Sequence, residues 1–289
     1  MFGEHKSLAL ILIPLGLSCL GGITANAQFR GAPSQAEIAK AKAAPTPRAK
    51  DGHPDLTGYW GGPEARGEVK VSTDGKTIEL QIATPKGILK QQAESGNTEG
   101  RARRAATEPE YKPELLGKIK TLHDNATDED PTYRCMPEGL PRIGPPTEIF
   151  QSPDAVALIY ANHNLARIIP TDGRAHDKAA DPSYFGDAVG RWEGDTLVVD
   201  VNRFNDQTWL SAEQGYFHTE ALHVIERFTR EGNTLRYEVT VEDPNVLTKP
   251  WVLNPRTLTM GKAVQHVIED PPCKEMDQSH LVDKYHKAP

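Results

Sequence analysis

The sequence predicts a mainly β protein, in which an antiparallel meander closes into a lipocalin-like barrel and one short helix precedes it. Short runs of alternating apolar and polar residues recur between residues 135 and 269, separated by Gly, Asn and Asp. The sequence shows neither a strand–helix–strand alternation nor a Gly-x-Gly-x-x-Gly motif, which argues against a nucleotide-binding α/β fold. Closure into a barrel is expected because it removes the exposed edges of a sheet of about eight strands.

Composition and charge narrow the class of protein. The chain has 289 residues, of which 37% are hydrophobic and 25% are charged, as is typical of a globular protein. Its net charge is −7 and its Lys and Arg residues are not clustered, which argues against nucleic acid as a partner. A mean hydropathy of −0.55 excludes a multi-span membrane protein. The partner we expect is a small-molecule ligand or substrate.

The N-terminus predicts a secretory signal peptide over residues 1–27. Lys6 precedes the apolar stretch Leu8–Leu20, and Ala25-Asn26-Ala27 supplies the small-x-small pattern at which signal peptidase cuts. An uncleaved anchor and a lipoprotein attached at Cys19 are the alternatives. Cleavage after Ala27 predicts a periplasmic or secreted protein with no membrane span.

The rest of the chain divides into two parts. Residues 28–53 are rich in Ala, Lys and Pro and have almost no large apolar groups, so they are expected to form a flexible lead-in. Residues 54–289 are expected to form a single β-rich domain.

The domain is expected to open with three local elements. Residues 55–60 are a short aromatic strand. Residues 69–82 alternate around Asp74-Gly75, which indicates a hairpin. Residues 113–123 have apolar side chains at helical spacing and begin with Pro, which predicts the short helix.

The meander follows. Alternation within its strands places Leu197, Val199 and Val201 on one face and Asp200 on the other, and this polar face could meet solvent or line a barrel cavity. The strands are expected at residues 147–151, 155–160, 165–170, 188–192, 196–201, 221–229, 235–242, 251–260 and 263–269.

Three blocks carry a resemblance to a known family. They are PDLTGYW (54–60), GRWEGDTLVVD (190–200) and HTEALHVIERF (218–228). The chain resembles a widespread family of exported bacterial proteins, marked by PDLSGxW, GxWEGDTLVVD and HSEALHxxERF, with Thr219 replacing the usual Ser. The resemblance implies export and assigns no reaction. The tripeptide Gly58-Tyr59-Trp60 is also similar to the Gly-x-Trp near the start of lipocalin-like barrels.

Two cysteines remain after signal-peptide cleavage. Cys135 and Cys273 enclose 273 − 135 + 1 = 139 residues, and an oxidising compartment favours one disulfide between them. The alternative is two unpaired thiols. The chain has no Cys-x-x-Cys motif, so a zinc site built on sulfur is not expected.

Three loops carry polar side chains suited to acid–base chemistry. Residues 172–176, 204–210 and 215–223 join consecutive strands, so we expect them to meet over a common hollow at one rim of the barrel. A carboxylate beside a histidine orients the ring and raises its basicity. The candidate catalytic residues are His218, His223, His176, Asp172, Asp206 and Glu220.

Other residues in or near these loops are candidates for binding. Arg167 and Arg174 would hold an anion, and Trp209 and Tyr216 would stack on a ring. The alternative for every candidate is a structural role in capping turns and packing the barrel end.

Metal binding is a second interpretation of the same histidines. His218, Glu220 and His223 offer nitrogen, oxygen and nitrogen ligands, and His176 or His163 would complete the site. On a strand, however, residue 223 faces away from residues 218 and 220 unless a bulge intervenes. We therefore expect no cofactor in the leading interpretation.

These observations favour an exported enzyme that uses His, Asp and Glu for acid–base chemistry, of the lyase, isomerase or hydrolase type, on a hydroxylated or aromatic small molecule. A non-catalytic, lipocalin-like ligand-binding protein, a metal-dependent enzyme and a structural envelope protein are the alternatives. The absence of Gly-x-Ser-x-Gly disfavours a serine hydrolase. An enzyme requires ionisable groups that converge on one cavity, whereas a carrier requires an apolar pocket.

Overall fold

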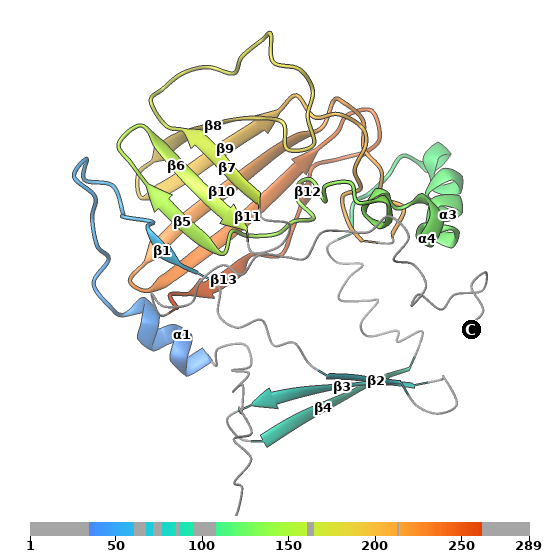
Figure 1. Cartoon of the computed structure of the whole chain (residues 1–289), viewed down its shortest axis with the longest axis horizontal. Coiled ribbons are helices and arrows are strands. Elements are labelled where there is room, and N and C mark those ends of the chain that lie inside the picture. The colour runs from blue at the N-terminus through green and yellow to red at the C-terminus, as the bar shows by residue number, and fades with distance from the viewer. Residues whose placement is uncertain are drawn as a thin grey trace, which may run out of the picture.

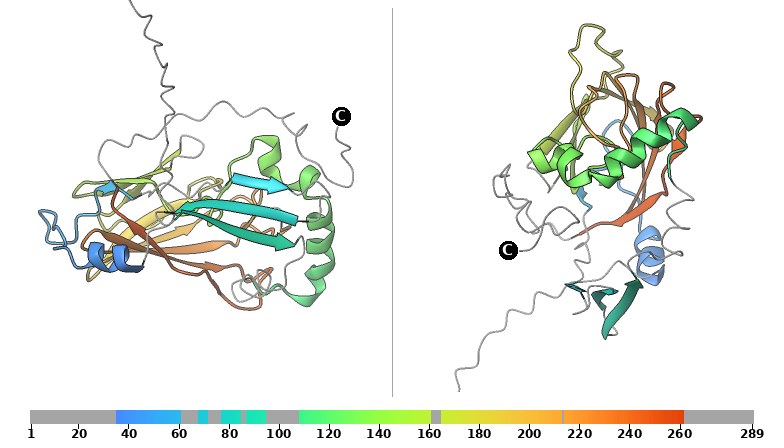
Figure 2. Two further views of the ribbon diagram at one scale, coloured as in Figure 1. Left: turned by 90° about the horizontal axis from the view of Figure 1, so that it is seen from below. Right: turned by 90° about the vertical axis from the view of Figure 1, so that its right-hand side faces the viewer.

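Two antiparallel sheets face each other across an apolar core, and a third antiparallel sheet of three strands is separate from them (Figures 1 and 2). The computed structural model describes residues 35–60, 68–71, 77–84, 87–94, 108–160, 165–212 and 214–261. The prediction of a mainly β, antiparallel protein is confirmed.

The order of strands in the first sheet is β1-β5-β6-β7, and in the second β12-β11-β10-β9-β8 with β13 also paired to β11. The first sheet comprises β1 (Gly58–Tyr59), β5 (Glu148–Gln151), β6 (Ala155–Tyr160) and β7 (Leu165–Pro170). The second comprises β8 (Asp187–Glu193), β9 (Thr196–Asn202), β10 (His223–Glu231), β11 (Thr234–Glu242), β12 (Trp251–Val252) and β13 (Arg256–Thr259).

Period-2 alternation builds the core between these sheets. Leu197, Val199 and Val201 of β9 point inward, as the sequence predicts, and meet Val156 and Leu158 of β6 in one buried cluster. All five side chains are fully buried, and burial of a side chain of this size contributes about 1.5–3 kcal/mol. Asp200, which alternates with Val199 and Val201 on β9, therefore lies on the outer face of the second sheet.

The expected lipocalin-like barrel is not confirmed, because no sheet in the described residues closes. The first sheet runs from β1 to β7 and the second from β12 to β8, so each keeps two ends. The apolar faces are buried instead by stacking one sheet on the other, which satisfies the same alternating pattern as a barrel does. Asp200 consequently lies on the outside of the second sheet and not in a central cavity.

The predicted helix is present at one end of the two-sheet body (Figure 1). It begins as the 3₁₀ turn η1 (Pro113–Leu115) and continues as α3 (Leu116–Asp124). The short helices α4 (Ala126–Glu129) and η2 (Pro131–Arg134) follow. Gly215 has φ +69°, and a Cβ there would lie 2.6 Å from the carbonyl oxygen of Ile119, so glycine lets the loop before β10 approach α3 closely.

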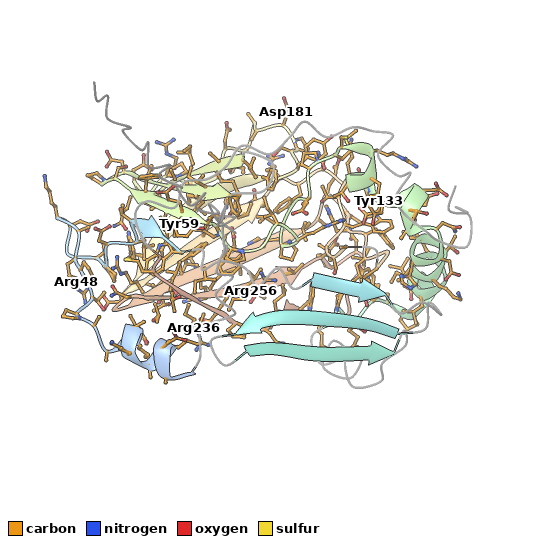
Figure 3. All side chains as sticks on the ribbon, turned by 60° about the horizontal axis from the view of Figure 1, so that its bottom comes forward. Arg48, Tyr59, Tyr133, Asp181, Arg236 and Arg256 are labelled. Atoms are coloured by element: carbon orange, nitrogen blue, oxygen red, sulfur yellow. The ribbon has the colours of Figure 1, made fainter. Side chains whose placement is uncertain are left out.

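The structure differs from the expected flexible lead-in over residues 35–53. Helix α1 (Gln35–Lys42) occupies the first part. Arg48 then donates two hydrogen bonds, of 2.6 and 2.7 Å, to Asp195 in the β8–β9 turn, and Thr46 accepts one from the Gly232 amide. These polar contacts attach a segment with few large apolar side chains to turns of the second sheet. Figure 3 labels Arg48 of this segment and Tyr59 of β1.

The three-stranded sheet contains the predicted hairpin. Strands β2 (Glu68–Val71) and β3 (Thr77–Thr84) pair with each other, and β4 (Gly87–Glu94), which the sequence interpretation did not include, pairs with β3.

Several predictions lie outside the described residues. They are the signal peptide 1–27, His163, the strand 263–269 and Cys273, so the Cys135–Cys273 disulfide stays a prediction. Among the described residues, no helix has the length and apolar character needed to cross a membrane.

Candidate functional site

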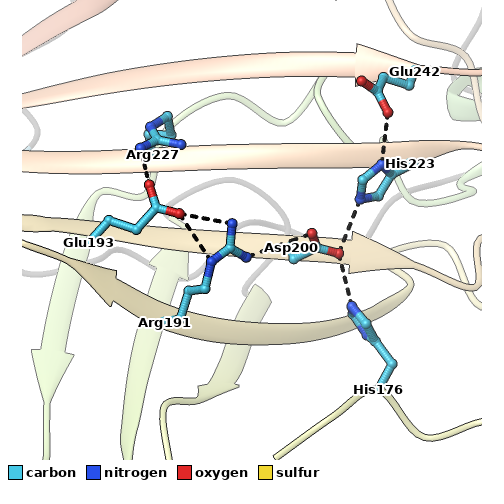
Figure 4. A network of polar contacts seen from close by, with 7 residues as sticks. All are labelled: His176, Arg191, Glu193, Asp200, His223, Arg227 and Glu242. Atoms are coloured by element: carbon cyan, nitrogen blue, oxygen red, sulfur yellow. Dashed lines mark hydrogen bonds and ion pairs between the residues drawn. The ribbon is translucent and has the colours of Figure 1, made fainter. Parts of the chain in front are cut away.

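One carboxylate, Asp200, lies between two histidines on the outer face of the second sheet (Figure 4). Its Oδ1 atom is 2.9 Å from Nε2 of His176 and 3.1 Å from Nε2 of His223. His176 belongs to the long β7–β8 loop, whereas Asp200 and His223 belong to β9 and β10. The contact thus joins segments that are 24 and 23 residues apart in sequence.

A carboxylate also faces the second nitrogen of each ring. Nδ1 of His176 is 2.8 Å from Asp187, and Nδ1 of His223 is 3.1 Å from Glu242. A carboxylate accepts hydrogen bonds, and only an imidazolium donates from both nitrogens. The arrangement is therefore fully satisfied when the two rings carry a positive charge.

The electrostatics of His223 and Asp200 agree with this geometry. Burial opposes the charge of His223, but hydrogen bonds to Glu242 and Asp200 outweigh it and raise the pKa of the ring. Burial likewise opposes ionisation of Asp200, but hydrogen bonds from His176 and His223 lower the pKa of this carboxyl group. Each charge thus stabilises its neighbours.

Strand register explains why β9, β10 and β11 present these groups together. Asp200 is directly opposite Ile225, so His223 is its diagonal neighbour on the same face, and His223 is directly opposite Glu242. Opposite and diagonal residues on one face are within reach of each other's side chains. The sheet therefore positions Asp200, His223 and Glu242, together with Asp187 of β8, whereas His176 depends on a loop.

Arginines continue the alternation of charges along the same face (Figure 4). Arg191 of β8 lies 3.9 Å from Asp200 and 2.9 Å from Glu193. Glu193 also pairs with Arg227 of β10, and the two arginines hold the pKa of Glu193 below its usual range.

Both histidines line a surface pocket of about 580 Å³. Three segments build it, one from each loop region in which the sequence predicts a common hollow. The lining residues are Ala175, His176, Asp177, Lys178, Pro182, Asn202, Arg203, Phe204, Glu220, Ala221, Leu222 and His223.

Two adjoining residues of the pocket wall have unusual local features. The Oδ1 atom of Asn202 is buried and has no hydrogen-bond partner within the described part of the chain. Arg203 has φ +61°, a left-handed conformation that is strained for a residue other than glycine, and its guanidinium donates to the Lys178 carbonyl. Strained backbone and unpaired acceptors are concentrated at functional sites more often than elsewhere.

The predicted site residues separate into two groups. His176, His223 and Glu220 line the pocket, whereas Asp172, Arg174 and Asp206 do not. Asp172 accepts hydrogen bonds from Arg174, which lower the pKa of the carboxyl group to about 2, so this pair is satisfied within its own turn. Asp206 is exposed.

His218 is buried away from the pocket lining. Its Nδ1 donates to the Thr219 carbonyl at 3.1 Å, so Nε2 is the acceptor for the Thr208 hydroxyl at 2.7 Å. Burial lowers the pKa of the ring, which keeps it neutral. His218 thus joins the loop after β9 to the loop before β10, and its expected catalytic role stays a prediction.

The expected binding residues also have structural partners. Arg167 is buried between the two sheets and forms a 2.7 Å ion pair with Glu226. Trp209 is buried, and Tyr216 stacks on Tyr111 with ring centroids 5.6 Å apart. None of the three lines this pocket, so their expected role in binding stays a prediction.

The metal-site alternative requires His218, Glu220 and His223 to meet. The ring nitrogens of His218 bond Thr208 and Thr219, and those of His223 bond Asp200 and Glu242. Within the residues that the structure describes, no group of three or more His, Cys, Asp or Glu side chains is arranged to hold a metal ion.

The sequence interpretation missed the three carboxylates of the site. Asp200 was placed on the polar face of its strand, but Asp187 and Glu242 were given no role. A signal existed, since Asp187 begins β8 and Glu242 ends β11, but its meaning depends on the register between strands. Comparisons with protein-family models, curated proteins and solved structures find no match, so the family resemblance remains a prediction.

Proposed function

We propose that the protein is an exported enzyme that transfers protons to and from a small hydroxylated molecule in the 580 Å³ pocket. The observation that carries this proposal is that two pocket-lining histidines share one carboxylate, Asp200. Proton transfer needs an acid and a base that are held in place, and a shared carboxylate orients both rings.

His223 is the candidate general acid. Its raised pKa favours the protonated ring, in which each of the two N–H groups has a carboxylate partner. One N–H stays hydrogen-bonded to Asp200. The proton of the other N–H, which faces Glu242 in the structure, is transferred to a substrate oxygen. The Glu242 side chain is 42% exposed, so it can move away from the ring. His176, the second ring bonded to Asp200, is the candidate base.

The pocket wall suggests the class of substrate. Lys178 and Arg203 provide positive charge for a carboxylate or an enolate formed during the reaction. The unpaired Oδ1 of Asn202 is an acceptor for a substrate hydroxyl. These groups favour a hydroxylated anion as substrate.

The alternative is a non-catalytic, lipocalin-like binding protein, although no sheet of the described residues closes into a barrel. Pro182, Phe204 and Leu222 supply an apolar part of the wall and support this alternative. A carrier would bind its ligand without moving a proton, so the two functions differ in a measurable reaction.

Solvent isotope exchange distinguishes them without knowledge of the product. The mature protein is incubated in D₂O with hydroxy acids, sugars and phenols, and proton NMR follows the loss of C–H signals and the appearance of products. We expect exchange or turnover of at least one compound, reduced about 100-fold or more by Asp200→Asn because the two rings lose their shared partner. Asp195→Asn, a matched change in the β8–β9 turn, should keep the wild-type rate. Saturable binding of a compound without exchange or turnover would favour the carrier.

A further inference from the structure

The outer face of the first sheet is largely apolar, and two of its large side chains are exposed. Strand register places uncharged residues in neighbouring rows on this face, with Glu148 as the charged member among its described positions. Phe150 is 52% exposed and Ile168 is 63% exposed. The other apolar members of the face are Tyr59, Ala155, Ala157, Ile159, Ala166 and Pro170.

We expect such an apolar face to pack against another layer of protein. In a two-sheet protein, residues along each strand normally alternate between the buried face and a polar outer face that meets water. Asp200 lies on such an outer face of the second sheet. A contiguous apolar area of this kind marks a surface at which something packs. In Figure 1 no described helix or strand crosses the outer face of β5, β6 and β7.

The three-stranded sheet β2–β4 has the complementary pattern. Its register pairs Val69 with Leu80, Val71 with Ile78, and Ile82 with Leu89, so these six positions share one face. The other face carries most of the charged positions: Glu68, Lys70, Glu79, Lys90 and Glu94. A sheet with one apolar face needs a second layer against that face to be stable.

A short segment of the chain connects the two sheets that carry these faces. Residue 60 is the last described residue after β1, the edge strand of the first sheet, and β2 begins at residue 68. Seven residues, 61–67, separate them, and an extended chain of that length spans at most about 25 Å. Facing sheets pack about 10 Å apart, so the connection is long enough for β2–β4 to lie on the outer face of β5–β7.

We propose that β2–β4, which Figure 1 draws apart from the first sheet, docks its apolar face on the outer face of β1-β5-β6-β7 and makes a third layer of the domain. The short connection favours this occupant over a second copy of the chain, because it holds β2–β4 at an effective concentration on the order of millimolar. The docked sheet would bury Phe150 and Ile168 and leave its charged face in water.

Hydroxyl-radical footprinting with mass spectrometry tests the proposal on the full mature chain. The structure leaves Phe150 and Leu116 similarly exposed, at 52% and 55%, so their relative oxidation rates report any cover. We expect Phe150, corrected for its intrinsic reactivity, to be oxidised several-fold more slowly than Leu116. Leu80→Asp, on the apolar face of β3, should remove this protection, whereas Glu79→Gln, on the opposite face, should not.

A second pair of variants tests the other surface. Ile168→Asp should undock β2–β4 and accelerate tryptic cleavage after Lys70 and Lys90. Val252→Asp is the matched control, because Val252 is 62% exposed but belongs to β12 of the second sheet. Wild-type Phe150 that reacts as readily as Leu116 would overturn the proposal. So would protection that disappears on dilution, since it would identify a second copy of the chain as the cover.

Discussion

The Nε2 atom of His176 lies 2.9 Å from Oδ1 of Asp200, and this contact attaches the β7–β8 loop to the outer face of the second sheet. The loop carries Ala175, His176, Asp177, Lys178 and Pro182 into the pocket wall. The same hydrogen bond therefore orients a candidate catalytic ring and shapes the cavity beside it.

Loss of the His176 ring should release this loop. We expect His176→Ala to increase amide hydrogen exchange in residues 171–186 and to lower the free energy of unfolding by about 1–3 kcal/mol, the range for a hydrogen bond to a charged group. Arg174→Ala is the control, because Arg174 pairs with Asp172 inside the loop. Equal exchange rates in the two variants would show that His176 does not hold the loop.

His223 should make stability depend on pH in a defined direction. Because its pKa is raised in the folded protein, the group contributes its full stabilisation below the unfolded value of about 6.5, and the contribution is lost as pH rises through the folded pKa. Urea unfolding at several pH values should therefore show His223→Gln most destabilised, by about 1–2 kcal/mol, at pH 5–6, and less so at higher pH. A difference that grows with pH would contradict the ion-pair geometry.

His218 should behave in the opposite way. Burial lowers its pKa, so the unfolded chain binds the proton more readily, and this group costs stability as pH falls below about 6.5. Long-range ¹H–¹⁵N NMR spectra should show the neutral tautomer protonated at Nδ1, with Nε2 accepting from Thr208. A His218 pKa above the usual value of about 6.5 would show that the ring is not held as described.

The ion pair between the two sheets allows a double-mutant test. Glu226 accepts from Arg167 at 2.7 Å and from Tyr237 at 2.9 Å, and Arg167 also donates to Tyr160 at 2.9 Å. Arg167→Met leaves the carboxylate buried without its cation and should cost about 3–5 kcal/mol in chemical denaturation. Adding Glu226→Gln removes the unpaired charge and should recover part of the loss. A double variant that is as unstable as the sum of the single variants would show that the two residues are not coupled.

The predicted disulfide can be measured directly. We expect the mature protein, denatured without reductant, to show no free thiol, and Cys135→Ser to expose one thiol at Cys273. Chain-entropy arguments give an upper value of about 4–5 kcal/mol for a loop of 139 residues, so reduction should lower stability measurably. Two reactive thiols in the wild-type protein would contradict the pairing.

Local pattern accounts for what the sequence predicted well. The alternation of Leu197, Val199 and Val201 identified a strand and its buried face, and Pro113 marked the start of the helix. These features depend on neighbours within a few residues, so they can be recognised in one dimension. The same local information placed Asp200 on the polar face.

The sequence by itself determined most of the strand segments and which of their faces are apolar, because strand alternation is a local property of the chain, but it did not identify β4. Whether the sheets close or stack, and which polar groups meet, depended on contacts between residues far apart in sequence. Apolar and polar residues alternate in the same way in a barrel and in two stacked sheets, so the alternation could not show whether the strands close into a lipocalin-like barrel. His218 and His223 look equivalent in sequence, yet tertiary packing buries one as a neutral ring and places the other between two carboxylates in the pocket wall.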